Sequence, residues 1–317
     1  MIANAKPRPL IRALALLAAA MTLPLLYVGG SVTTYKVGMA VPDWPTTFHE
    51  NMFTYNFWRA PFGVQVEHVH RLYGAAVGLA TLVLTVALLA FEPRRWLKAL
   101  GVLALAAVIG QGVLGGLRVN WNSTVLAAAH GCVGQGFFGL LVALCVFSGK
   151  DWNTAEDQTA DPANLRWRSM FGLGMIYAQI LAGSWLRHFA TPMALWIHSA
   201  LAVVVVVYSG WLTRLVKAHR AETPRLVGPA RLLSAVAGIQ ILLGVVVLVL
   251  LWPLDGTARP VPAIQAAIRT GHQTNGALLF AVSIVLTLRS FRHHAGAPAQ
   301  APDPHAEPGK LDLEAVA

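Results

Sequence analysis

The stretch Val66-Glu67-His68-Val69-His70-Arg71-Leu72-Tyr73-Gly74 places an acid, two imidazoles and a guanidinium at the start of an apolar run that continues to Phe91. Ionisable side chains at membrane depth are costly, so they usually face a cavity or the interior of a helix bundle. Glu67 and His70 are three residues apart and share one face of a helix, whereas His68 points elsewhere. One helix face therefore carries a carboxylate beside a potential metal ligand.

Single histidines recur near the start of three other apolar segments, at His130, His198 and His272. A buried histidine on its own is most often a hydrogen-bonded contact between helices, but four at corresponding positions indicate a shared purpose. A small residue follows each of the four by one helical turn, which leaves room beside the imidazole. These small residues are Gly74, Gly134, Ala202 and Gly276.

The composition identifies an integral membrane protein. Of 317 residues, 56% are hydrophobic and only 12% are charged, which is too apolar for a soluble domain of this size. A helix needs about 20 residues to cross the bilayer core. Eight segments are long enough: Ile11–Val32, Val66–Phe91, Trp96–Val119, Thr124–Ser148, Ser169–Phe189, Pro192–Leu215, Leu232–Trp252 and Ile264–Phe291.

The net charge of +10 reflects membrane topology and gives no indication of nucleic-acid binding. Of the 24 lysines and arginines, 17 lie at the N-terminus and in alternate loops, and seven lie on the other side. The positive-inside rule then places both termini in the cytoplasm, or in the equivalent matrix compartment. We expect a multi-pass protein of the bacterial inner membrane whose first apolar segment is retained as a span.

The second part of the chain repeats the first. Gln111 and Gly115 are spaced as Gln-x-x-x-Gly, and the same spacing recurs from Gln179 and from Gln240. The expected fold is therefore an all-α integral membrane protein whose eight transmembrane helices form two tandem, pseudo-symmetric four-helix bundles. The expected boundaries are 1–150 for the first half, 151–168 for a cytoplasmic linker, 169–292 for the second half and 293–317 for a disordered tail.

The spacing predicts that two histidines face each other within each half, His70 with His130 and His198 with His272. Two imidazoles with little else polar suit haem iron, because the porphyrin supplies the other four ligands. Zinc would need a third or fourth protein ligand. The external arginines Arg71, Arg118, Arg187 and Arg269 fit haem propionates, although snorkelling into solvent is an equally good interpretation of each.

Two further features concern the outer face of the first half. Only this half has a carboxylate beside its histidine, since the positions matching Glu67 are Leu195, Ala127 and Arg269. We therefore expect the halves to differ in role. The long loop from about Thr33 to Gln65 is rich in aromatic residues, which is typical of either an interfacial belt or a lid over a cavity.

These residues resemble the haem A synthase family, membrane enzymes that oxidise haem O to haem A for cytochrome oxidase. The resemblance rests on Pro42-Asp43-Trp44-Pro45, on Glu67-x-x-His70-Arg71 and on the single histidines of the later segments, and it covers roughly residues 11–291. Many bacterial members carry a cysteine pair in the first external loop. Here both cysteines, Cys132 and Cys145, lie in one transmembrane segment, where we expect them to be packing residues.

The resemblance implies a division of labour. His198 and His272 would ligate a resident haem b, and His70, His130 and Arg71 would bind the substrate haem O. Glu67 would act in turnover, either by stabilising a cationic intermediate or by moving a proton. Haem O synthase becomes the implied partner in the lipid bilayer. Neither the electron acceptor nor the oligomeric state, for which a homo-oligomer is one option, follows from the sequence.

Two other functions are compatible with the pattern. A dihaem b-type electron-transfer cytochrome would use the same four histidines, but it has no need of Glu67 or of an enclosing loop. A haem or quinol transporter built from parallel repeats predicts broken helices near the middle of the membrane, whereas the polar residues here lie near one surface.

Overall fold

The computed structural model describes residues 8–153, 159–251 and 260–295. Within these ranges eight helices are long and apolar enough to cross a membrane, which confirms the predicted all-α multi-pass class. The long helices are α1 (Pro9–Thr34), α2 (Phe62–Phe91), α3 (Arg95–Asn120), α4 (Thr124–Phe147), α6 (Leu165–Phe189), α7 (Pro192–Ala218), α8 (Pro224–Leu250) and α9 (Ala263–His293). The short elements are η1 (Phe57–Arg59), α5 (Lys150–Asn153), β1 (Thr159–Ala160), η2 (Pro162–Asn164) and β2 (His294–Ala295).

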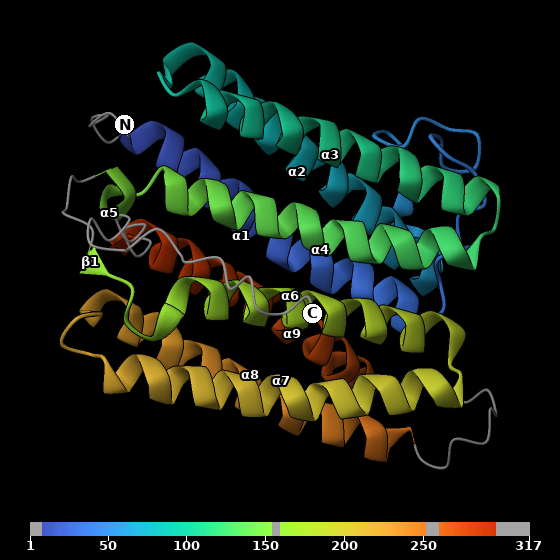
Figure 1. The fold of residues 1–317 in the computed structure, drawn as a ribbon. Helices are drawn as coiled ribbons and strands as arrows, with labels where there is room; N and C mark the ends of the chain where they lie inside the picture. Colours follow the sequence, from blue (N-terminus) through green and yellow to red (C-terminus); the bar gives the residue numbers. More distant parts are fainter. Residues whose placement is uncertain (1–7, 154–158, 252–259, 296–317) are drawn as a thin grey trace, which may run out of the picture.

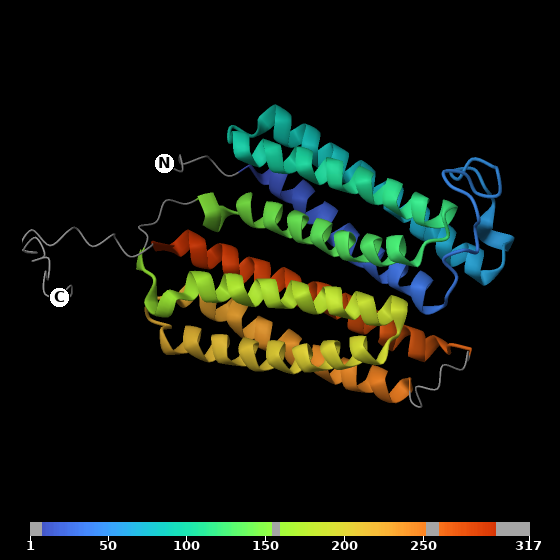
Figure 2. The ribbon, with the colours of Figure 1, turned by 45° about the vertical axis from the view of Figure 1, so that its right-hand side comes forward.

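The long helices form two four-helix bundles (Figure 1). In the first, α1 to α4 each contact the next helix along the chain, and α1 also contacts α4. Helices α6 to α9 repeat this arrangement, with α6 contacting α9. Contacts of α9 with α1 and α4, and of α6 with α4, join the two bundles. The start of α1 and the end of α9 lie at one end of the molecule, and the loop between α1 and α2 lies at the other (Figures 1 and 2).

Each bundle has its own apolar core. Leu84 and Leu141 are fully buried in the first, and Leu212 and Leu286 are almost fully buried in the second. The outward faces are also apolar, as at Leu242, which is 67% exposed. Apolar side chains on the outside of a helical bundle are expected where the surroundings are lipid and the backbone is already satisfied within each helix.

Polar contacts hold the two bundles together near their outer end. The hydroxyls of Thr34 in α1 and Thr270 in α9 are buried and lie 3.2 Å apart. Arg187 of α6 donates through Nη2 to the Thr34 hydroxyl and to the carbonyl oxygen of Gly30, both at 2.6 Å. Such bonds between helices are favourable where water is scarce.

The connection between the bundles is shorter than the expected linker, 151–168. Helix α6 begins at Leu165, because the carboxylate of Asp161 accepts hydrogen bonds from the N–H groups of Leu165 at 2.7 Å and Arg166 at 3.3 Å. Strand β1 pairs in parallel with β2, so His294 and Ala295 belong to the fold although the tail was expected from 293. Residues 296–317 of that tail lie outside the described residues.

The largest error in helix boundaries concerns α8. The sequence predicts a span from Leu232, but the helix begins eight residues earlier, at Pro224. Proline is well suited to the first turn of a helix, where its missing N–H costs no hydrogen bond. Pro229 then lies inside the helix. The segment before Leu232 contains Arg225 and Arg231 as well as the two prolines, so it is not part of the apolar run that predicts the span.

A topology experiment tests the predicted orientation. A reporter fused after Arg292 should report the cytoplasm, and one inserted near Asn51 should report the outside, because most lysines and arginines lie at the end where α1 begins. A reporter at Glu222, between α7 and α8, serves as a second cytoplasmic control. Reversal of the first two reporters would contradict the assigned orientation.

Candidate functional site

The structure brings the four histidines together as two pairs, one in each bundle. The ring centroids of His70 on α2 and His130 on α4 are 6.3 Å apart, with an interplanar angle of 89°. Those of His198 on α7 and His272 on α9 are 6.2 Å apart, at 80°. The two halves therefore present the same facing pair, from corresponding helices, with nearly the same geometry.

Each imidazole lies against a glycine of the neighbouring helix. A Cβ added to that glycine would lie only 2.8 to 3.2 Å from the Cε1 atom of the ring, so a larger residue would displace the histidine. The pairs are Gly29 with His70, Gly115 with His130, Gly183 with His198 and Gly244 with His272. Three of these glycines end the Gln-x-x-x-Gly repeats. The sequence contains the repeat, but it did not predict that the glycines contact the imidazole rings.

The side chains of the repeat glutamines contact the histidines of the second pair, but no such side-chain bond occurs in the described part of the first half. The Nε2 atom of Gln179 lies 3.1 Å from Nδ1 of His198 and donates to the His198 carbonyl oxygen at 3.0 Å. Gln240 contacts Nε2 of His272 more weakly, at 3.4 Å. In the first half, Nε2 of Gln111 is buried without a hydrogen-bond partner among the described residues. Leu25 occupies the position on α1 that corresponds to Gln179.

The donor set of each pair fits haem iron. The rings of each pair face each other with centroids 6.2 to 6.3 Å apart, which leaves room for one metal ion between them. Among the described residues, no group of three or more His, Cys, Asp or Glu side chains is placed to hold a metal ion. A porphyrin supplies the four missing ligands. Among the described residues, Nδ1 of His70, His130 and His272 is buried without a hydrogen-bond partner.

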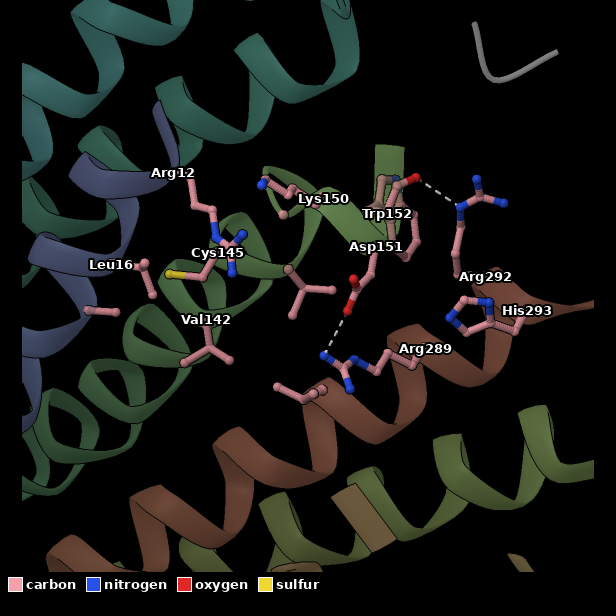
Figure 3. Close-up of a pocket in the computed structure, with 14 residues that line it drawn as sticks. Arg12, Leu16, Val142, Cys145, Lys150, Asp151, Trp152, Arg289, Arg292 and His293 are labelled. Carbon is pink, nitrogen blue, oxygen red and sulfur yellow. Dashed lines mark hydrogen bonds and ion pairs between the residues drawn. The ribbon is translucent and has the colours of Figure 1, made fainter. Parts of the chain in front are cut away.

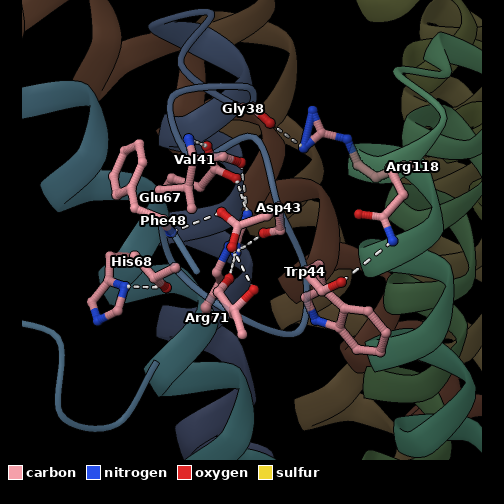
Figure 4. Close-up of polar contacts among 12 residues, drawn as sticks. Gly38, Val41, Asp43, Trp44, Phe48, Glu67, His68, Arg71 and Arg118 are labelled. Carbon is pink, nitrogen blue, oxygen red and sulfur yellow. Dashed lines mark hydrogen bonds and ion pairs between the residues drawn. The ribbon is translucent and has the colours of Figure 1, made fainter. Parts of the chain in front are cut away.

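The loop between α1 and α2 is fastened to the first pair's helix by Arg71 (Figure 4). Its Nη1 atom donates to the carbonyl oxygens of Asp43 at 2.6 Å and Thr46 at 3.0 Å. Its Nη2 atom donates to the carbonyl oxygen of Val41 at 3.0 Å and to Oε1 of Glu67 at 2.8 Å. We expected Arg71 to bind the substrate haem, but these four bonds show that it fixes the loop, and a contact with a propionate stays a prediction.

Glu67 is 3% exposed, and both of its carboxylate oxygens are engaged. Oε1 accepts from Arg71, and Oε2 accepts from the N–H of Val41 at 3.1 Å. The carboxylate is thus an anchor of the loop as well as the one acid on the His70 helix face. Glu67 and Arg71 thus form a buried ion pair on α2, within one turn of His70.

Asp43 shapes the part of the loop that Arg71 holds. Its carboxylate accepts hydrogen bonds from the N–H groups of Phe48 at 2.8 Å and His49 at 2.9 Å, and from the Thr46 hydroxyl. Burial acts to raise the pKa of Asp43, but these hydrogen bonds outweigh it and hold the pKa below its ordinary value. The ionised carboxylate therefore stabilises the turn at neutral pH.

The loop also packs against the helices through its aromatic rings. The Trp44 ring lies against Gly116 of α3, where an added Cβ would overlap it. His68 is fully buried under the loop, with ring centroids 4.8 Å from Phe57 and 5.4 Å from Tyr55. The sequence said only that His68 points away from His70. The loop rings that pack on the helices are consistent with a lid. Exposed rings such as Trp58, which is 78% exposed, are consistent with an interfacial belt.

Three further arginines lie near helix ends at the same end of the molecule as the loop between α1 and α2: Arg118, Arg187 and Arg269. Nη1 of Arg118 donates to the Gly38 carbonyl oxygen at 2.8 Å, and its buried Nε has no hydrogen-bond partner among the described residues. Arg269 lies close enough to Arg187 for the two charges to interact. None of these three forms a salt bridge with a described carboxylate, which leaves them suited to an anionic group.

Comparison with known proteins identifies the family. A model of the COX15-CtaA family, described as cytochrome oxidase assembly protein, matches residues 12–196, which is more than half of the chain. This range contains Glu67, His70 and His130, whereas His198 and His272 lie beyond it and are related to the first pair by the internal repeat and its geometry. A search of curated proteins found no match. The chain belongs to the COX15-CtaA family of cytochrome oxidase assembly proteins.

Proposed function

We propose that this protein is a haem A synthase, which oxidises the C8 methyl group of haem O to a formyl group. The observation that carries the proposal is the difference between two otherwise matching halves. Both hold a facing imidazole pair, but among the described residues only the first half adds a buried carboxylate on the histidine's helix and a loop anchored to it. A site for chemistry and a site for electron transfer would differ in this way.

In the second half, His198 and His272 would hold a resident haem b. Bound by two imidazoles, this haem supplies one-electron transfer. Gln179 and Gln240 restrain the two rings, and second-shell contacts of this kind orient metal ligands. A rigid pair suits a cofactor that stays in place.

In the first half, His70 and His130 would position the iron of the substrate haem O. The loop around Asp43 and Trp44 packs over the end of this bundle, and Arg71 holds it there, so it would shield a bound haem from water. Glu67 places a negative charge on the His70 helix face, where it can stabilise positive charge that develops during oxidation. Moving a proton instead would require Glu67 to exchange its hydrogen bond from Val41.

A dihaem b-type cytochrome is the alternative, and the near-identical geometry of the two pairs favours it. That function leaves the buried Glu67 and its loop without a role. On either proposal the protein acts in a bilayer, which we place in the bacterial inner membrane with both termini cytoplasmic. Haem O synthase would supply the substrate of the enzyme.

Alanine substitutions test the assignment of the two pairs. His198→Ala or His272→Ala should remove most of the low-spin haem b signal from the purified protein, because each removes one of the two imidazoles that would hold the haem iron. His70→Ala and His130→Ala are the matched controls and should spare that signal while abolishing haem A formation. A full bis-histidine haem b spectrum in both second-half variants would show that the ligands are assigned wrongly.

Glu67→Gln tests the catalytic role of the carboxylate. The change removes the negative charge but keeps the size of the side chain, so haem b should stay bound while haem A falls by about 10- to 100-fold, toward the lower range for positioned acid–base groups. The measurement is chromatography of haem extracted from cells that also express a haem O source. Haem A per unit of protein is compared with wild type.

Because Glu67 also anchors the loop, a second variant separates the two roles. Asp43→Asn disturbs the turn, since an amide oxygen replaces only one of two acceptor atoms, but leaves Glu67 untouched. A catalytic Glu67 predicts a much larger loss of haem A in Glu67→Gln than in Asp43→Asn. Equal losses would show that Glu67 only anchors the loop. An unchanged haem A yield in Glu67→Gln would favour the dihaem cytochrome instead.

A further inference from the structure

Arg187 of α6 reaches from the second bundle into the first. Its Nη2 atom donates to the Gly30 carbonyl oxygen and to the Thr34 hydroxyl of α1, both at 2.6 Å. A carbonyl oxygen has two lone pairs, so Gly30 can accept this bond in addition to one within its own helix. Hydrogen bonds from a charged donor are stronger than those between neutral groups, and they strengthen further where water is scarce. One side chain of the second bundle therefore holds one helical turn of the first.

That turn of α1 is the one against which His70 packs. A Cβ added to Gly29 would lie 2.8 Å from Cε1 and 3.3 Å from Nδ1 of the His70 ring. Gly30 follows directly, and its carbonyl oxygen is an acceptor for Arg187. A shift of this turn away from α2 would open a gap behind the His70 ring, and the ring could then rotate.

The other side of the same turn packs on α9 next to His272. A Cβ added to Gly30 would lie 2.8 Å from Oε1 of Gln273 and 2.9 Å from Cγ2 of Thr270. The hydroxyls of Thr34 and Thr270 lie 3.2 Å apart. The turn is thus packed between a helix of the first histidine pair and a helix of the second.

The second bundle has a similar contact that involves no charge. Gly183 of α6, which packs against a histidine of the second pair, is followed by Ser184. The Ser184 hydroxyl donates to the carbonyl oxygen of Ala128 on α4 at 3.3 Å. Ala128 lies two residues before His130. In both halves, therefore, a helical turn that supports a histidine is bonded to the opposite bundle.

Only the turn that supports His70 is held by a cation in this way. Arg187 stands eight residues after Gln179 on α6. Thr33 stands eight residues after Leu25, the counterpart of Gln179 on α1. The Thr33 hydroxyl donates within its own helix, to the Gly29 carbonyl oxygen at 3.4 Å. The charged bond across the interface therefore supports the first histidine pair.

Packing between the bundles is interrupted at the opposite end. In the described part of the chain, a pocket of about 350 Å³ lies there between α1, α4, α5 and α9 (Figure 3). Its walls include Leu16 of α1, Val142 of α4 and Val285 of α9. Because close packing fixes the position of a helix and is interrupted here, the contacts near the outer end are needed to fix α1 beside α9.

We propose that Arg187 is a positioning residue for the first histidine pair. By holding the Gly29–Gly30 turn from the second bundle, it keeps the His70 ring in the orientation that binds the iron of haem O. This role rests on the proposed function, in which His70 and His130 bind that iron. It also makes the substrate site complete only when the two bundles are docked.

Haem O titration of the purified protein with its resident haem b tests this role. Binding is followed in the Soret difference spectrum under anaerobic conditions, so that turnover does not contribute. Arg187→Gln should raise the apparent Kd for haem O by about 10-fold, as expected when a buried bond from a charged donor is lost. Part of the bound haem O should become high-spin, because a displaced His70 ligates the iron incompletely. Resident haem b should be retained, since His272 packs on α8 and His198 on α6 itself.

A conservative variant should rescue binding. Both bonds of Arg187 come from Nη2 alone, and a lysine Nζ can replace one nitrogen. Arg187→Lys should therefore keep the Kd for haem O within about 3-fold of wild type. The matched control is Arg59→Gln, which removes an exposed external arginine from η1 and should leave the titration unchanged.

A second variant tests the role without removing a charge. Thr34→Val keeps the shape of the side chain but removes one of the two acceptors of Arg187. It should raise the Kd for haem O in the same direction, by about 3-fold. This variant also serves if Arg187→Gln fails to fold, and an unchanged Kd in Thr34→Val would then count against the role.

The dimethyl ester of haem O separates positioning from binding of a propionate. Positioning predicts that Arg187→Gln weakens binding of the ester by the same factor as binding of haem O. Loss of that factor with the ester would make Arg187 an anion-binding residue and overturn the proposal. An unchanged Kd and spin state in Arg187→Gln, or equal losses of haem b and haem O, would overturn it as well. Wild-type protein that binds no haem O, or binds it equally well in His70→Ala, would contradict the proposed function itself and this role with it.

Discussion

The close approach of each imidazole to a glycine on the neighbouring helix is the constraint on which the structure depends. A ring that packs on a backbone cannot turn freely, and the helices must come close enough to form the contact. The same contact occurs four times, twice in each bundle, and fixes all four histidines near the outer end. It thereby sets the spacing of about 6 Å between the two rings of each pair, on which the proposed haem binding depends.

The two bundles share one fold, but their histidine pairs have different neighbouring side chains. The repeated bundle supplies two equivalent imidazole pairs, while a few side chains give the two pairs different surroundings. Gln179 restrains the second pair, and Glu67 with Arg71 places a charged, covered environment beside the first. Burial of an ion pair is costly unless its remaining donors and acceptors are satisfied, and the carbonyl oxygens of the loop satisfy Arg71. The covering loop and the buried charge therefore depend on each other.

The sequence predicted the eight spans, the two bundles and the pairing of the histidines, because hydropathy and repeated spacing are properties of the chain itself. It did not predict that Arg71 binds the backbone of a loop about 30 residues away, since loop conformation depends on tertiary contacts. The burial of His68 under aromatic rings was missed for the same reason. The early start of α8 was missed because Arg225 and Arg231 interrupt the apolar run on which the prediction depends, although proline can begin a helix.

The central claim is that the two halves hold different haems, and the haem content of the purified protein tests it most directly. Pyridine haemochrome spectra and chromatography of the extracted pigment, normalised to protein, count each haem type. We expect one haem b per chain together with haem O or haem A. The amount of haem O or haem A depends on how fully the first histidine pair is occupied. Two haem b per chain, with neither haem O nor haem A, would contradict it and identify a dihaem cytochrome.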